Sequence, residues 1–184
     1  MATAMSDREA MDRRATVLSA ARWCFLNFGF QKTSFEDIAK RAHLSRTLLY
    51  RLFSDKKAIY RAVFIDWLVS RHGAAKAVAK REGSAAERLL EFCRLMVAEP
   101  WAEMVGAPMG AEFLATCERV DPKTGELHLE VLRRGATALL GDAASAEVFL
   151  LALDGLLADQ PSAAVLEKRI ALLVARFAPR GKRP

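Results

Sequence analysis

The sequence is poor in the residues that build disulfide frameworks, metal sites and catalytic clusters. It has three cysteines and three histidines among 184 residues, and no Cys-x-x-Cys pair. This spacing excludes a zinc finger and predicts that Cys24, Cys93 and Cys117, each within an apolar helical pattern, are buried free thiols. The sequence shows no pattern that would place a nucleophile next to a general base or two carboxylates next to each other, as a catalytic site would need. We therefore expect neither an enzyme nor a bound metal or cofactor.

Long apolar runs are missing as well. No uninterrupted apolar stretch reaches the roughly 18 residues of a membrane span, and the N-terminus lacks the apolar segment of a secretory signal. These absences predict a cytoplasmic protein without membrane contact, whose thiols stay reduced. β-Branched and aromatic residues are sparse, whereas Ala and Leu dominate. This composition predicts an all-α chain, because straight side chains lose little freedom in a helix.

Positive charge is present in excess, and it is concentrated at one end of the chain. The formal net charge is +6, from 28 Lys and Arg against 22 Asp and Glu. Residues 1–61 hold 12 of the basic and 6 of the acidic residues, so the rest of the chain is neutral. The N-terminal third would therefore attract a polyanion, and nucleic-acid phosphate is the obvious partner.

Apolar periodicity and capping residues predict a series of helices. Gly29 is expected to end the first helix, and the capping box Ser84-x-x-Glu87 to start another. Residues 101–110 are expected to be irregular. Helices are predicted over residues 6–28, 33–41, 45–53, 55 into the seventies, 84–100, 111–119, 127–140, 142–158 and 162–177.

The segment from Thr33 to Phe53 has the pattern of two short helices joined by a tight turn. Two overlapping Ser/Thr-x-x-acid patterns, beginning at Thr33 and at Ser34, mark the start of the first helix. Residues 42–44 interrupt it, and Ser45 is a good N-cap for the second helix. Apolar side chains are spaced to form a shared core, at Ile38, Leu44, Leu49 and Leu52. This is the pattern of a helix-turn-helix.

The second of these helices would expose a polar face suited to DNA. An Arg can read guanine edges or bind phosphate, a Thr can contact either, and a Tyr suits a phosphate oxygen. Any one of these residues alone could be an ordinary solvated side chain, but together they favour DNA binding. The residues of this face are Arg46, Thr47, Tyr50 and Arg51, followed by Lys56.

Over residues 14–63 the sequence resembles the TetR (tetracycline repressor-like) family of bacterial transcription regulators. The matching positions are Val17-Leu18-x-Ala20-Ala21, Phe25, Phe28-Gly29-Phe30, Thr33-Ser34-Phe35, Asp37-Ile38-Ala39, Leu44-Ser45, Leu49-Tyr50-x-x-Phe53 and Lys56-x-x-Ile59. The resemblance implies a homodimer that binds a palindromic operator in double-stranded DNA. It also implies that a small molecule entering the C-terminal domain releases the operator.

The resemblance further implies roles for single residues. Thr33, Ser34 and Lys56 would touch phosphate, and Tyr50 would sit against the DNA backbone. The helix that begins at Arg46 would face the major groove. The predicted DNA-binding residues are Thr33, Ser34, Ser45, Arg46, Thr47, Leu48, Tyr50, Arg51 and Lys56.

Two positions depart from the family pattern. His43 stands where the turn usually has glycine, although histidine tolerates a positive φ better than most residues. Leu48 replaces a residue that often carries a hydroxyl, and it can offer only an apolar contact, for example to a thymine methyl group.

The C-terminal part carries no motif. Residues 150–157 are apolar nearly all round, so that helix needs cover on both faces, and the last helix adds a second apolar flank. Pairing the last two helices with their symmetry mates would form a four-helix dimer interface. The predicted interface residues are Leu150, Leu153, Leu157, Ile170, Leu173 and Phe177. Simple core packing is the alternative for all of them.

A pocket for a small apolar ligand is predicted between the middle helices. Its lining would be Trp67, Phe92, Met96, Trp101, Met104, Met109, Phe113 and Cys117. Plain core packing is again the alternative for each. Polar groups that could orient a ligand there are Glu103, Glu112 and His128, unless they lie at the surface.

These patterns predict two domains and a tail. Residues 1–54 would form an N-terminal three-helix helix-turn-helix DNA-binding domain, and residues 55–178 a C-terminal helical bundle for ligand binding and dimerisation. Residues 179–184 would be a disordered basic tail. The predicted function is a ligand-responsive repressor, with a long fourth helix linking the two domains. The alternative is a helical protein-interaction module without DNA binding.

Overall fold

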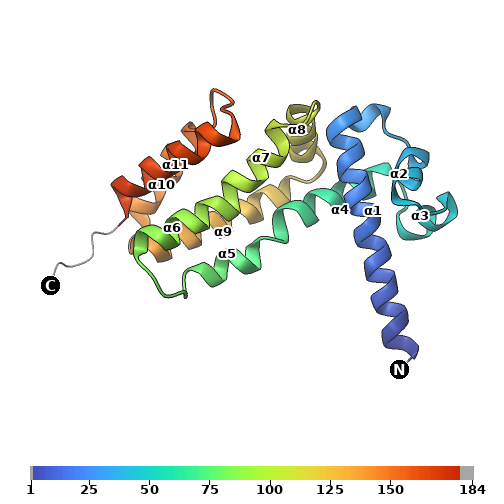
Figure 1. The fold of residues 1–184 in the computed structure, drawn as a ribbon, viewed down its shortest axis with the longest axis horizontal. Coiled ribbons are helices and arrows are strands. Elements are labelled where there is room, and N and C mark those ends of the chain that lie inside the picture. Colours follow the sequence, from blue (N-terminus) through green and yellow to red (C-terminus); the bar gives the residue numbers. More distant parts are fainter. Residues whose placement is uncertain (1, 179–184) are drawn as a thin grey trace. The chain divides into compact units, whose positions relative to one another are not determined.

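The structure, a computed structural model, describes residues 2–178, without the side chains of residues 2–7 and 118. Within that range every regular element is a helix, as the composition predicts (Figure 1). The elements are α1 (Ala2–Lys32), α2 (Phe35–Ala42), α3 (Arg46–Leu52), α4 (Lys56–Val69), α5 (His72–Val78), α6 (Ala85–Cys93), the π-helical η1 (Arg94–Ala98), α7 (Glu99–Val105), α8 (Gly110–Val120), α9 (Pro122–Leu140), α10 (Ala143–Gly155) and α11 (Ala163–Phe177). Among the described residues, no helix is long and apolar enough to cross a membrane.

Contacts divide the chain into two compact units. Unit 1 extends through Asp66 and also contains Ala107–Pro122, whereas unit 2 contains Trp67–Gly106 and the chain from Lys123. Unit 1 therefore includes most of α4 and the whole of α8 besides the N-terminal helices. The predicted domains, divided at residue 54, stay a prediction. The predicted disordered tail lies outside the described residues.

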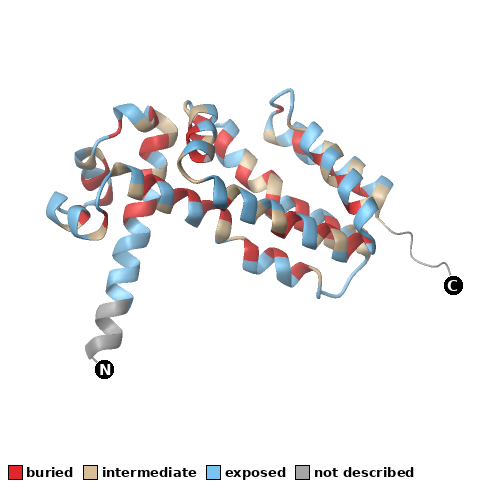
Figure 2. Cartoon of the chain, turned by 180° about the vertical axis from the view of Figure 1, so that it is seen from behind, coloured by how far each residue is buried: buried red, intermediate tan, exposed pale blue. Residues whose placement is uncertain are grey.

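The core of unit 1 is built on one face of α1. Val17, Ala21 and Phe25 recur every four residues, so they share a face, and all three are buried. α2 packs against α1, and its Ile38 is fully buried. Residues 8–16, in contrast, are exposed along the first part of α1 (Figure 2). The regular helix ends at Gly29, as predicted, where φ is 79°.

The core of unit 2 is shared by α6, η1, α9, α10 and α11. Its fully buried side chains include Leu89, Phe92, Met96, Phe149 and Leu166. The N-caps predict the helix starts well: Ser84, Asp142 and Ser162 each accept a hydrogen bond from a backbone N–H three residues ahead. The three cysteines are buried free thiols, as predicted, at Cys24, Cys93 and Cys117.

The predicted long fourth helix is two helices. α4 ends at Val69, and a turn at residues 70–71 separates it from α5. The Arg71 side chain donates to the Trp67 carbonyl and pairs with the Glu103 carboxylate. A contact between residues 32 positions apart therefore helps to hold this turn, and Gly73 lies inside α5.

The stretch predicted to be irregular, residues 101–110, is helical through Val105. Pro100 was expected to end a helix, but it lies in the first turn of α7. The π-helical η1 ends directly before α7, so the helical path continues through the proline. The π-helical η1 connects α6 to α7 without a loop. α1 also begins earlier than predicted, at Ala2, because the residues around it are good helix formers.

Candidate nucleic-acid interface

Two side-chain caps and one left-handed residue shape the helix-turn-helix. Ser34 forms a full capping box with Asp37, and each side chain binds the backbone N–H of the other. His43 ends α2 with φ 54° and ψ 37°, the left-handed conformation that the turn requires. Ser45 then caps α3 by accepting from the Leu48 N–H at 3.2 Å. The predicted helix starts and the histidine turn are therefore present.

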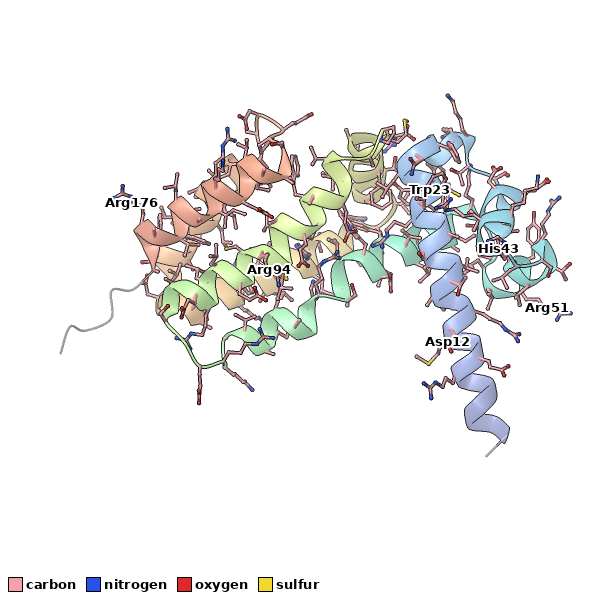
Figure 3. All side chains as sticks on the ribbon, in the orientation of Figure 1. Asp12, Trp23, His43, Arg51, Arg94 and Arg176 are labelled. Carbon is pink, nitrogen blue, oxygen red and sulfur yellow. The ribbon has the colours of Figure 1, made fainter. Side chains whose placement is uncertain are left out.

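α3 buries one face and exposes the other. Leu49 is fully buried and Leu48 is half-buried, whereas Arg46, Thr47 and Arg51 are exposed. Arg51 projects outward from α3 (Figure 3). This face offers two guanidinium groups and a hydroxyl, the groups that bind base edges and phosphate.

The Tyr50 ring stacks against the ring of Phe35. The Tyr50 side chain is 54% exposed, and the two rings have centroids 4.5 Å apart and planes 14° apart. Phe35 is the first residue of α2, so the stack ties α3 to the start of α2. The stacking limits the freedom of the Tyr50 ring, and an ordered phenol suits a phosphate contact.

A shallow hollow of about 410 Å³ gathers several of the predicted contacts at one place. Its lining residues are Gln31, Lys32, Thr33, Ser34, Phe35, Glu36, Arg46, Tyr50 and Lys56. The structure thus brings together five of the predicted DNA-binding residues. The other four, Ser45, Thr47, Leu48 and Arg51, lie elsewhere on α3 or at its cap. Lys32 is an exposed cation in the hollow that the sequence interpretation missed, although it directly precedes Thr33-Ser34.

Glu36 supplies the negative charge of this hollow. Its carboxylate pairs with Lys40 at 2.8 Å and with Arg46 at 3.7 Å. The hydrogen bond and charge of Lys40, with a smaller effect of Arg46, lower the pKa of Glu36. The pair holds Arg46 near the start of α2, and because both groups are exposed it is weak enough for a phosphate to displace it.

Thr33 and Lys56 face into the fold. The Thr33 side chain is 1% exposed, and its hydroxyl donates to the Gly29 carbonyl at 2.7 Å. The Lys56 ammonium donates to the carbonyls of Phe30, Gln31 and Thr33 at 2.7, 3.2 and 2.9 Å. All three of its protons are thus used, and burial lowers its pKa. Both side chains hold the turn between α1 and α2.

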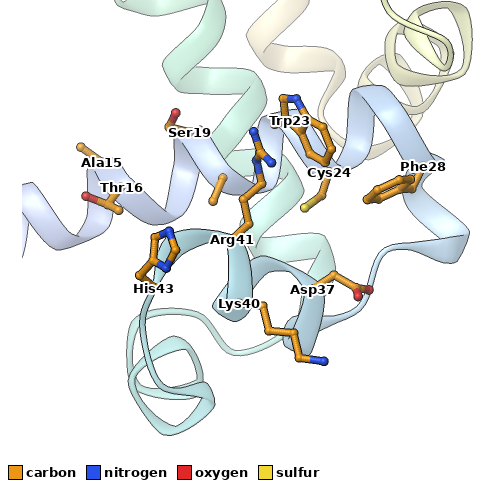
Figure 4. A pocket seen from close by; sticks show the side chains of 11 residues that line it. Ala15, Thr16, Ser19, Trp23, Cys24, Phe28, Asp37, Lys40, Arg41 and His43 are labelled. Carbon is orange, nitrogen blue, oxygen red and sulfur yellow. The ribbon is translucent and has the colours of Figure 1, made fainter.

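A second hollow in unit 1, of about 890 Å³, lies between α1 and α2 (Figure 4). The Arg41 guanidinium lies 3.4 Å from the centre of the Trp23 ring, in the range of a cation–π contact. Trp23 in turn meets Phe28 edge-on, with centroids 5.3 Å apart. Burial raises the pKa of Cys24 in this hollow, so its thiol stays protonated. The aromatic pair and Arg41 brace α2 against α1.

The predicted ligand-binding side chains are divided between the two units. Phe113 and Cys117, on α8, belong to unit 1, and the others belong to unit 2, except Met109, which precedes α8 in unit 1. All of them except the half-buried Trp101 and Met109 are buried in this structure. Phe92 lies so close to Gly135 that a β-carbon there would be 2.2 Å from its ring. A hollow of about 590 Å³ in unit 2 is lined instead by α9, α10 and the residues after α10, including Leu132, Leu150 and Leu157, with Val97 of η1.

The three polar residues proposed for that pocket are all engaged in the structure. Glu103 pairs with Arg71, and Glu112 binds the backbone of unit 1. His128 Nδ1 lies 3.1 Å from His72 Nε2, and its Nε2 lies 3.2 Å from the Met96 carbonyl.

The predicted dimer residues lie on a different face from the exposed apolar side chains. Leu153 and Ile170 are buried in the core of their own chain. The remaining four, Leu150, Leu157, Leu173 and Phe177, are half-buried against that core. The exposed apolar side chains of α10 and α11 are Val148, Leu151, Val165 and Leu172. The sequence interpretation missed them, because an apolar helix does not reveal which side its own core covers.

Comparison with known proteins identifies the helix-turn-helix. Residues 17–63 match the family model described as bacterial regulatory proteins of the tetR family. No curated protein matches the sequence. The matched range runs from the buried Val17 of α1 into α4, so it contains both short helices and the turn.

Solved structures share the fold along nearly the whole chain. A TetR transcriptional regulator from Streptomyces coelicolor is 20% identical, with a TM-score of 0.65 over 91% of this chain and 99% of its own. A TetR-family regulator from Agrobacterium tumefaciens is 16% identical, with a TM-score of 0.66 over 92% and 100%. The regulator FadR from Bacillus subtilis, solved with stearoyl-CoA, is 13% identical, with a TM-score of 0.61 over 90% and 99%. The matched family model shows that residues 17–63 form a DNA-binding domain of the tetR type of bacterial regulatory proteins, and the solved structures show that the helical fold is shared along most of the chain.

Proposed function

We propose that the chain is a transcription repressor that binds a palindromic operator as a homodimer and releases it when a small apolar molecule binds in unit 2. The observation that carries the proposal is the exposed face of α3 beside the hollow of about 410 Å³. Guanidinium, hydroxyl, phenol and ammonium groups meet there, which is the chemistry that DNA requires.

The side chains divide into three tasks. Arg46, Thr47 and Arg51 would reach base edges or flanking phosphates in the major groove, with Leu48 as an apolar contact. Tyr50 and Lys32 would bind phosphate at the rim of the hollow, near the start of α2 at Ser34. Ser45 would act as the cap of α3, while Thr33 and Lys56 would fix the turn before Ser34.

Dimerisation would use the apolar side chains that a single chain leaves exposed. Leu151 is 69% exposed on α10 and Leu172 is 67% exposed on α11. Val148 on α10 and Val165 on α11 extend this exposed apolar surface. A palindromic operator requires two DNA-binding domains related by a two-fold axis, and such a dimer would provide them.

A ligand-controlled release is supported by two observations. FadR, which shares the fold, was solved with stearoyl-CoA. The interior of unit 2 is apolar and contains adaptable side chains, among them Met96 and Met104, next to the polar His72–His128 pair. An apolar molecule that bound there would have to displace side chains that now fill the space.

DNA binding by the purified full chain tests the proposal. Duplexes selected from randomised DNA would be labelled and titrated over a salt series. We expect sequence-selective binding that weakens steeply with salt, since each phosphate contact releases a counterion.

A matched pair of variants separates recognition from general charge. Arg46→Ala should weaken binding at least about tenfold. Lys80→Ala, which removes the same charge from an exposed position in unit 2, should change binding little. Binding that ignores both sequence and salt would reject the repressor and favour a helical protein-interaction module.

A further inference from the structure

The turn between α1 and α2 is held by two charged side chains that are distant in the sequence. The Glu112 carboxylate of α8 accepts a hydrogen bond from the Phe30 N–H at 3.0 Å. The Lys56 ammonium of α4 donates to the Phe30 carbonyl at 2.7 Å. A carboxylate therefore binds the backbone donor of Phe30, and an ammonium group binds the backbone acceptor of the same residue. Hydrogen bonds to charged groups are stronger than those between neutral groups.

Gly29 is what allows Glu112 to reach the turn. Its φ of 79° and ψ of 167° are open to glycine and strained for other residues. A β-carbon at this position would lie 2.9 Å from both carboxylate oxygens of Glu112 and 3.0 Å from the Met109 methyl group. Just before α8, the Met109 N–H also donates to the Leu26 carbonyl at 2.9 Å. The start of α8 is thus attached to the end of α1 at two points.

Tyr60 extends this attachment into the core of unit 1. Its hydroxyl is buried and donates to the carbonyl of Phe113, the neighbour of Glu112, at 2.7 Å. Its ring meets the Phe30 ring edge-on, with centroids 5.0 Å apart. Burial raises the pKa of Tyr60, so the hydroxyl remains a donor. α4, α8 and the turn therefore share one hydrogen-bonded cluster.

We propose that Glu112 is a positioning residue for DNA binding: it fixes the turn that sets Ser34 and the start of α2. The inference rests on the proposed function and adds a residue that does not contact DNA. Both ends of α8 continue into unit 2, at Gly106 and at Lys123.

Three substitutions at Glu112 separate hydrogen bonding from charge. Alanine removes the acceptor, glutamine keeps an acceptor at the same reach, and aspartate keeps the charge but shortens the reach. Operator affinity should fall about tenfold in Glu112→Ala and in Glu112→Asp, the loss expected for one charge-assisted hydrogen bond. Glu112→Gln should stay within about threefold of the wild type.

Glu126→Ala is the matched control. Glu126 is exposed on α9, and its loss raises the net charge by one, as Glu112→Ala does. If charge alone mattered, both variants would bind DNA more tightly. We expect only Glu112→Ala to bind more weakly. The Phe30 amide should also exchange hydrogen faster in Glu112→Ala without DNA, and at the wild-type rate in Glu126→Ala.

Each outcome decides the matter. Wild-type affinity in Glu112→Ala overturns the proposal, as does a Glu112→Asp variant that binds well while Glu112→Gln binds poorly. If Glu112→Ala fails to fold, the comparison of the Gln and Asp variants carries the test. If the wild type selects no duplex, the proposed function fails instead. In that case, hydrogen exchange at the Phe30 amide still tests the role of Glu112. An unchanged exchange rate in a folded Glu112→Ala variant would show that Glu112 does not hold the turn.

Discussion

At the scale of single residues, Gly29 and Gly73 provide opposite tests of what glycine contributes. Gly29 has a positive φ and faces the Glu112 carboxylate, whereas Gly73 lies in α5 with nothing within 4 Å of a β-carbon. Gly29→Ala should lower the free energy of unfolding by about 1–3 kcal/mol. Gly73→Ala should raise it by up to about 1 kcal/mol, since alanine favours the helix. Urea unfolding measures both, and equal effects would contradict the strain at Gly29.

Lys56 is expected to act on stability and not on phosphate. Its ammonium binds three carbonyls of the α1–α2 turn. Lys56→Ala should therefore reduce the free energy of unfolding by about 1–3 kcal/mol. The salt dependence of DNA binding should keep its slope, because no phosphate contact is lost. The neighbouring Lys57 is exposed, so Lys57→Ala should leave stability unchanged.

The opposite result would restore the role that the family resemblance implies. A slope lower by about one in Lys56→Ala, at unchanged stability, identifies a lysine that clamps phosphate. The sequence alone favours that role because a basic residue follows the recognition helix. Only the positions of the Phe30, Gln31 and Thr33 carbonyls, 26 to 23 residues away, direct the ammonium inward.

At the scale of elements, two histidines join α5, η1 and α9. His72 Nε2 is 3.1 Å from His128 Nδ1, and His128 Nε2 is 3.2 Å from the Met96 carbonyl in the π-helical segment. Both contacts are satisfied when each ring is neutral, with Nε2 as the donor in both. Burial lowers the pKa of both histidines; Lys76 adds to this for His72, and His72 and Arg71 for His128. Glu99 and Glu103 face Arg71 there.

This pair makes stability depend on pH. The pKa of His128 is lowered to about 4 from its ordinary 6.5, so the unfolded chain takes up a proton first as the pH falls. The stability is fully present above 6.5 and is lost as the pH falls toward 4. From about pH 7 to pH 5 the free energy of unfolding should drop by about 2 kcal/mol from His128 alone.

Removing the titrating ring tests this pH dependence. The drop should shrink in His128→Gln and persist in His43→Asn, a change at an exposed histidine whose left-handed turn asparagine tolerates. Urea unfolding at both pH values measures it. An equal drop in all three proteins would assign the effect to other groups.

How far the sequence predicts these elements depends on the range of the interactions that fix them. The helix starts at Ser34, Ser84 and Asp142 are predicted because each cap lies within three residues of its partner. The break at residues 70–71 depends on Arg71 binding Glu103, 32 residues away. The helical path through Pro100 likewise involves the packing of η1 and α7 against α11, which begins more than 60 residues beyond Pro100. Local patterns carry no information on such distant partners.

The candidate site shows the same division. The exposed face of α3 follows from helical periodicity, so Arg46, Thr47 and Arg51 are placed outward as predicted. The inward turn of Thr33 requires the positive φ of Gly29, which directs its carbonyl toward the hydroxyl. The role of Glu112 in unit 1 could not be predicted, because it follows from α8 packing beside α1 across 82 residues.

At the scale of the whole molecule, the exposed leucines predict an assembly. Leu151→Glu places a charge where we expect a partner helix, and it should shift the chain from dimer to monomer by at least about tenfold in the dissociation constant. Helical content should stay, because Leu151 is 69% exposed within one chain. Leu127→Glu, at a residue 49% exposed on α9, is the control and should remain dimeric. Sedimentation velocity measures the mass, and a dimeric Leu151→Glu would refute this interface.

The membership of α8 in unit 1 also sets an order of events during synthesis. A ribosome releases the helix-turn-helix long before Glu112 and Phe113 are made, because chains grow from the N-terminus. Until then the Phe30 N–H and the Tyr60 hydroxyl lack the partners that they have in the finished fold. The growing chain therefore acquires its complete DNA-binding head only after Trp67–Gly106 has been translated. For the same reason, when the DNA-binding domain is transferred to another regulator to make a hybrid protein, residues 107–122 should be transferred together with the N-terminal helices.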